Sequence, residues 1–179
     1  ELSREVFKPV DLLEIFTNIL DIYRDPLKRS IKKDALSNIS VITEQGMNII
    51  LNAQSEENFV VLGIEMRLGQ VFQNLLANAL SFSKQGQNIK IVISRRLNAV
   101  IATVEDEGPG IPETKLDSIF ERFYSERPQH EDYGRHSGLG LSICKQIIEA
   151  HQGRIFAENR KDLSGKVLGA KFTVILNKI

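Results

Sequence analysis

Two asparagines are spaced so that their side chains could bind a cation and a phosphate group. Asn74 and Asn78 are four residues apart in a segment, residues 67–83, whose apolar residues recur at helical spacing. The two amides are therefore expected to stack one turn apart, at the edge of the apolar arc. A carboxamide oxygen can ligate a hard cation while its NH2 group donates to a phosphate oxygen. The alternative is a polar edge on a half-buried helix, which is common.

A glycine-rich turn follows a predicted apolar strand and begins with an acidic residue. Asp106 comes at the end of the strand, and Gly108 and Gly110 follow within four residues. Glycines let a backbone approach a ligand closely. A carboxylate can accept a hydrogen bond from an exocyclic amine such as that of adenine. An ordinary Gly-Pro turn would have the same composition, and this turn alone does not distinguish the two.

A second glycine segment, Gly138-Leu139-Gly140, opens a predicted helix that ends near residue 151. Free amides at a helix N-terminus favour anions, and glycines leave room for a phosphate. Ser137 could cap this helix or donate to the phosphate. Neither glycine segment fits GxxxxGK[ST], and neither completes GxGxxG after a strand, so P-loop and Rossmann fingerprints are absent from the sequence.

Two phenylalanines precede a polar segment. Phe120 and Phe123 come just before residues 124–137, which are charged and poor in apolar residues and which we interpret as a mobile loop. Aromatic residues at this point would anchor a lid. Simple core packing of a short helix would produce the same pattern.

The elements that must position these residues are predicted from periodicity. Helices are expected from near Asp11 to residue 23, over 67–83, over 113–120 and from Gly138 to about residue 151. Strands are expected at residues 39–43, 47–51, 59–62, 89–96, 99–105, 154–158 and 170–176. This order predicts an α+β fold, with a mixed sheet and helices on one face.

Composition excludes several other classes. The net charge is zero, which argues against a broad nucleic-acid surface. A single cysteine, Cys144, excludes a disulfide within the chain, and the histidines form no HExxH motif. No apolar run approaches the ~18 residues that a membrane span needs. We expect a soluble, intracellular, single-domain protein.

Together and in this order, the four features resemble the N, G1, F and G2 boxes of the ATP-binding domain of sensor histidine kinases. That domain shares a superfamily with gyrase, Hsp90 and MutL. The resemblance extends from about residue 10 to the C-terminus. Residues 59–63, 67–71, 81–83 and 137–143 also look like the ChvG/ExoS group of these kinases. The family implies a Bergerat-type two-layer sandwich, with ATP bound between the second helix and a lid at about 124–137.

The resemblance also implies a role for each matching residue. Asn78 would ligate Mg2+, and Asn74 would contact the phosphates or the metal. The adenine amine would be bound by Asp106, in a pocket shaped by Gly108 and Gly110. Backbone amides would reach the phosphates from the segment that comprises Ser137, Gly138, Leu139 and Gly140, and Phe120 would help to anchor the lid.

Two positions depart from the family pattern. Ser81 stands where many members have Lys or Arg, and His136 replaces the first glycine of the G2 box. Arg127 or Arg135 could supply the missing cation, although solvent exposure is the simpler interpretation of both.

Three alternatives from other functional classes remain. A gyrase-like or Hsp90-like ATPase needs a general base at the position of Asn74, and asparagine cannot take a proton at neutral pH. Anti-sigma-type kinases that act on Ser or Thr usually have Glu there. A non-catalytic adaptor is supported only by Ser81 and His136.

The resemblance implies that the chain is the catalytic fragment of a protein-histidine kinase. Residues 1–8 would be the end of a linker, and 9–179 the ATP-binding domain. Its partners would be the helical dimerisation domain that carries the acceptor histidine and, through the full-length kinase, a response regulator. We expect no contact with nucleic acid or membrane, a monomeric isolated domain, and a cytoplasmic location within an inner-membrane kinase.

Overall fold

A six-stranded mixed sheet organises the computed structural model, which describes residues 6–23, 38–54, 58–122 and 139–179. The strand order is β2-β3-β5-β6-β8-β7. β3 and β5 are parallel, and the other neighbouring pairs are antiparallel. The strands of this sheet are β2 (Asn38–Ile42), β3 (Asn48–Ala53), β5 (Asn88–Arg96), β6 (Ala99–Glu105), β7 (Arg154–Lys161) and β8 (Val167–Asn177).

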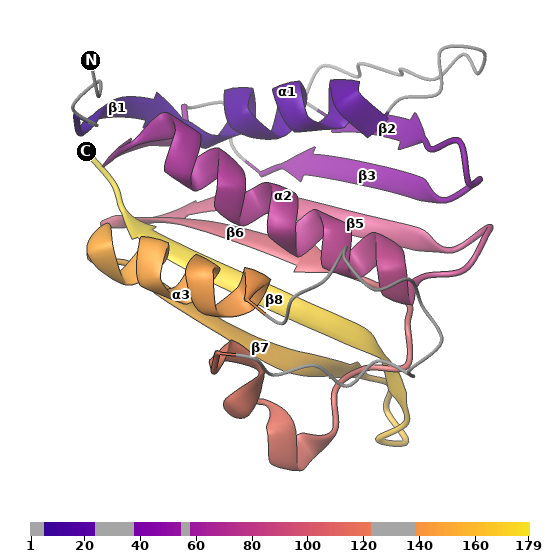
Figure 1. Cartoon of the computed structure of the whole chain (residues 1–179). Helices are drawn as coiled ribbons and strands as arrows, with labels where there is room; N and C mark the ends of the chain where they lie inside the picture. The colour runs from indigo at the N-terminus through magenta and orange to yellow at the C-terminus, as the bar shows by residue number, and fades with distance from the viewer. Residues whose placement is uncertain (1–5, 24–37, 55–57, 123–138) are drawn as a thin grey trace.

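Helices cover one face of the sheet (Figure 1), so the predicted α+β, two-layer class is confirmed. They are α1 (Leu12–Tyr23), α2 (Glu65–Phe82) and α3 (Gly140–Ala150). Alternate residues of the central strands meet the apolar arcs of these helices, as the period-two and helical patterns require. In the described part of the chain, no helix is both long and apolar enough to cross a bilayer.

A small second sheet lies beside the N-terminus of α2. It pairs β1 (Lys8–Asp11) with β4 (Val60–Gly63), and β1 was not predicted, because four residues are too few to show a pattern. The helix start near Asp11 is confirmed. α1 begins at Leu12, and the Asp11 carboxylate accepts a hydrogen bond from the Leu13 N–H at 2.9 Å.

The strand predicted at residues 99–105 is confirmed with the same ends, and the other predicted elements are confirmed with shifted ends, except one. Residues 113–120 were expected to form a helix, but they form two separate 3-10 turns, Glu113–Lys115 and Ser118–Phe120. Three-residue turns of this kind carry too little sequence to show a helical period. The predicted lid at 124–137, with Phe123, lies outside the described residues.

Candidate functional site

α2 is the element on which the site is built. Its apolar residues from Leu68 to Ala79 that face the sheet and the neighbouring helices are buried, whereas Phe82 at its end is 44% exposed. Asn74 and Asn78 are half-buried on the adjoining face, as the spacing predicted. The backbone carbonyl of Asn78 accepts a hydrogen bond from the Ser81 hydroxyl at 2.8 Å. The side-chain amide of Asn78 makes no hydrogen bond to any described residue, so it is free to meet a ligand.

The Asp106 carboxylate is held in one orientation at the end of β6. The side chain is 3% exposed. Its Oδ1 accepts hydrogen bonds from the backbone N–H groups of Gly108, at 2.9 Å, and Ala170, at 3.0 Å. No described residue donates to Oδ2, so that oxygen can accept a hydrogen bond from a ligand. Burial raises the pKa of this carboxyl, while the two backbone donors and the nearby Arg160 charge oppose the rise.

Two glycines allow close backbone packing around Asp106. A Cβ at Gly108 would lie 2.7 Å from the carbonyl oxygen of Phe82, so the turn lies against the C-terminal end of α2. A Cβ at Gly169 would lie 1.9 Å from the carbonyl oxygen of Asp106. Gly169 was missed from sequence, although a glycine inside a strand is itself a signal of close backbone approach.

The N-terminus of α3 approaches the middle of α2. A Cβ at Gly140 would lie 3.8 Å from the side chain of Asn74, whose Nδ2 donates to the Gly140 carbonyl oxygen over 3.5 Å. Leu139, the N-cap residue, supplies no side-chain hydrogen bond to the first turn. The first N–H groups of α3 thus point out of the helix without intrahelical partners, an arrangement that suits an anion. The predicted contributors Ser137 and Gly138 lie outside the described residues.

These contacts bring three predicted groups to one face of α2. Gly140 lies beside Asn74, and Gly108 lies beside Phe82. Eight residues separate Asn74 from Phe82, which is about 12 Å along a helix axis. Asn78 is midway between them. A ligand that spans this face from the Asp106 turn to the start of α3 would pass the Asn78 amide.

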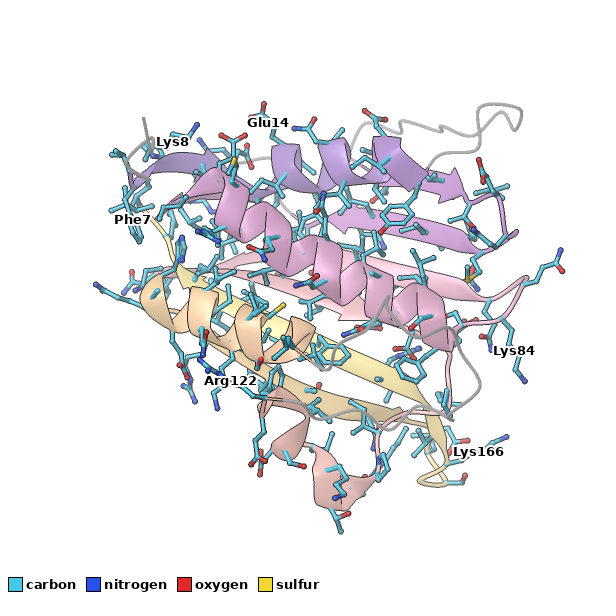
Figure 2. All side chains as sticks on the ribbon, viewed as in Figure 1. Phe7, Lys8, Glu14, Lys84, Arg122 and Lys166 are labelled. Atoms are coloured by element: carbon cyan, nitrogen blue, oxygen red, sulfur yellow. The ribbon has the colours of Figure 1, made fainter. Side chains whose placement is uncertain are left out.

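The end of the molecule that carries the Asp106 turn is identified in Figure 2. Lys84, which follows α2, and Lys166, in the turn between β7 and β8, lie at this end. Phe7 and Lys8 lie at the opposite end. The site is therefore remote from the N-terminal strand β1.

Phe120 and Cys144 are core residues. The ring of Phe120 meets the ring of Phe172 edge-on, with centroids 6.4 Å apart, and Phe120 is 8% exposed. Core packing, the simpler alternative, accounts for these contacts, and a role as a lid anchor stays a prediction. Cys144 is fully buried beside α2, and burial raises the pKa of its thiol to about 12, so it is unsuited to act as a nucleophile.

Two functional candidates on β7 were missed from sequence. Asn159 and Arg160 make hydrogen bonds to the turn that begins at Asp106, across 48 and 54 residues of sequence. No spacing signal predicts contacts at that separation. Among the described residues there is also no group of three or more His, Cys, Asp or Glu side chains that could hold a metal. A metal here would need amide oxygens and the ligand's own oxygens.

Comparison with known proteins identifies the family. Residues 63–178 match the family described as "Histidine kinase-, DNA gyrase B-, and HSP90-like ATPase". The chain belongs to this family. It is 41% identical over 177 residues to the sensor protein ChvG of Agrobacterium fabrum, covering 98% of this chain and 28% of that protein. The resemblance to ChvG-type sensor kinases is confirmed, and the chain spans less than a third of that relative's length.

Solved sensor kinases of the same fold support this assignment. The catalytic domain of histidine kinase ThkA is 26% identical with a TM-score of 0.73, covering 96% of this chain and 95% of that one. ThkA has also been solved in complex with the response regulator TrrA. Its chain there is 25% identical with a TM-score of 0.70, covering 97% of this chain and 42% of that one. As a member of this ATPase family, the chain is an ATP-binding domain.

Proposed function

We propose that the chain binds ATP together with Mg2+ and, within a longer sensor kinase, donates the γ-phosphate to a histidine on a separate helical dimerisation domain. The observation that carries this proposal is the amide of Asn78, which makes no hydrogen bond to any described residue. It lies midway between a buried carboxylate suited to an amine and a helix N-terminus suited to phosphates. These are the two ends of a nucleoside triphosphate.

The chain's own residues would each perform one task. Asp106 Oδ2 would accept the adenine amine, and the first N–H groups of α3 would donate to the phosphates. Asn78 Oδ1 fits Mg2+ because an amide oxygen is a hard ligand and this one has no other hydrogen bond in the described chain. Bound Mg2+ would supply charge neutralisation for the triphosphate. Catalysis would then rest on position and charge, which is typical of phosphoryl transfer.

The residue at position 74 favours a kinase over a rapid ATPase. Hydrolysis needs a group that activates water, and an asparagine amide cannot accept that proton. Asn74 is moreover directed at α3, where its Nδ2 lies 3.5 Å from the Gly140 carbonyl oxygen. The lack of a group that activates water suits a kinase, because ATP must persist until the acceptor histidine arrives.

The partners and location follow from the kinase assignment. By analogy with ThkA in complex with TrrA, the full-length protein would pass its phosphoryl group to a response regulator. The domain would work in the cytoplasm, as part of a kinase anchored in the inner membrane.

Calorimetric titration with ADP and a non-hydrolysable ATP analogue, with and without Mg2+, tests this function. We expect Mg2+ to tighten binding to the wild type and to have no such effect on Asn78→Ala, because the metal ligand is gone. Gln73→Ala is a matched control, since this exposed residue lies on the same helix. A wild type that binds no nucleotide would refute the proposal, and rapid phosphate release from ATP, measured in a separate assay, would favour the ATPase alternative.

A further inference from the structure

Two consecutive residues of β7 hold the two ends of the turn between Asp106 and Ile111. At the first end, Arg160 Nη1 donates to the carbonyl oxygen of Asp106 at 2.7 Å. At the C-terminal end of the turn, Asn159 makes two hydrogen bonds to the backbone of Ile111. Its Oδ1 accepts from the Ile111 N–H at 2.7 Å, and its Nδ2 donates to the Ile111 carbonyl oxygen at 2.6 Å. The Asn159 amide thus pairs with the backbone of Ile111 as a neighbouring strand would.

The two residues reach the turn from opposite faces of the sheet, because successive strand residues alternate. Asn159 shares its face with Ile155 and Ala157, which pack against the core. Arg160 is on the other face, where its Nε pairs with the Glu105 carboxylate at 3.2 Å. The turn is therefore hydrogen-bonded from both faces of the sheet.

The turn packs closely against Asn159 at Gly110. Gly110 has a φ of +78°, a value that side chains rarely adopt. A Cβ at Gly110 would lie 2.7 Å from Asn159 Oδ1 and 2.5 Å from a methyl group of Val167. The turn therefore needs glycine at position 110, because the Asn159 amide and Val167 occupy the space that a side chain would take.

We propose that Asn159 and Arg160 are positioning residues that set the selectivity of the site for the nucleotide base. They act through the turn, since their hydrogen bonds go to the backbone at its two ends, and this backbone carries the Asp106 carboxylate and the two glycines. This inference rests on the proposed function, because it concerns the base end of the same nucleotide site. It separates base recognition, which depends on β7, from phosphate binding, which depends on α2 and α3.

The test measures the affinities of the wild type and its variants for ADP, GDP and tripolyphosphate. In Asn159→Asp, an oxygen replaces Nδ2 and faces both the Ile111 carbonyl and the Glu113 carboxylate, which is 3.3 Å from Nδ2. Arg160→Gln removes the charge beside Asp106 and Glu105. We expect each variant to lose about tenfold or more in ADP affinity, the loss typical of one or two hydrogen bonds, while affinity for tripolyphosphate is retained. The ratio of ADP to GDP affinity should fall toward one.

Two further variants make the readout specific. Glu158→Gln is the matched control, because this adjacent residue pairs with Lys171 at 3.1 Å and does not touch the turn. It should keep the wild-type ADP-to-GDP ratio. Arg160→Lys retains a cation and should restore part of the ratio.

Separate results would overturn this inference and the proposed function. If the wild type prefers ADP and the folded variants keep the same ratio of ADP to GDP affinity, the positioning role is overturned but the proposed function is not. Equal losses for tripolyphosphate and ADP, or loss of folding in both variants, would also overturn it, because the contacts would then be merely structural. A wild type without nucleotide binding would overturn both.

Discussion

The two oxygens of the Asp106 carboxylate have different surroundings. One accepts hydrogen bonds from two backbone N–H groups, and the other has no donor in the described chain. In Asp106→Asn, the amide oxygen can keep the first set, but an NH2 group then replaces Oδ2. We expect this variant to fold normally and to bind ADP more weakly, on the order of 10- to 100-fold, because two donors would face each other. Titration with ADP and GDP measures the loss, and an undiminished preference for ADP would contradict the assignment.

The same variant has a distinct dependence of stability on pH. Burial is the largest influence on Asp106 and raises the pKa of the carboxyl in the folded state. A carboxyl whose folded pKa is raised lowers stability when ionised, and this cost disappears as the pH falls through that pKa. Asp106→Asn should therefore be at least as stable as the wild type at pH 7, and any advantage should shrink in acid. Urea unfolding across pH 4–7 checks the sign, and an advantage that grows in acid would refute it.

Candidate site residues could be identified from the sequence where they belong to a local pattern. Asp106 was found because it ends an apolar strand before two glycines, and the structure buries it there. Asn74 and Asn78 were found from their helical spacing. Asn159 was not found, because its only signal is a contact with Ile111, 48 residues away. Local spacing therefore picks out candidate ligand contacts and misses residues whose contacts are distant in the sequence.

Elements were predictable in proportion to their length. The twelve residues of α1 and the eighteen of α2 show the helical period clearly. In the hairpin of β5 and β6, burial alternates along all of β6 and along β5 as far as Ser94. β1 has four residues and the 3-10 turns have three each, so no period is visible in them. Tertiary contacts fix such short elements.

His151 links three elements and carries a prediction at this scale. Its Nε2 accepts a hydrogen bond from the Ile64 N–H at 3.0 Å, at the N-terminus of α2. Its Nδ1 lies 2.7 Å from the Ile147 carbonyl oxygen in α3, and its ring contacts Phe7. We expect His151→Phe to lower the free energy of unfolding by about 1–3 kcal/mol, because the Ile64 N–H would lose its acceptor. Chemical denaturation measures this.

Replacement with glutamine provides the control for His151. The Gln Oε1 can reach the place of Nε2 and accept from Ile64, so His151→Gln should be more stable than His151→Phe. Equal losses in the two variants would mean that ring packing beside Phe7, and not the hydrogen bond, holds these elements together.

The sheet brings together site residues that are far apart in the chain. β6 and β8 are neighbours, and so are β8 and β7, so Asp106 lies beside Ala170 and within reach of Arg160. Element order alone did not predict this strand order, since several mixed sheets fit the seven strands and four helices that the sequence predicts. The order of the elements predicted a mixed sheet, but not which strands are neighbours in it. The site thus depends on the whole topology.

Because the site joins α2, α3, β6 and β7, a bound nucleotide should stabilise the domain as one unit. A ligand that binds only the folded state adds about 2.7 kcal/mol at 100 times its Kd. For a domain of this size, we expect ADP at that concentration to raise Tm by roughly 5–10 °C in one transition. Calorimetric melting of the wild type measures the shift, and Asp106→Asn should show a smaller one at the same ADP concentration. If ADP raised the Tm of only part of the transition, these elements would not unfold together. A part that unfolds independently of the site would keep its own Tm.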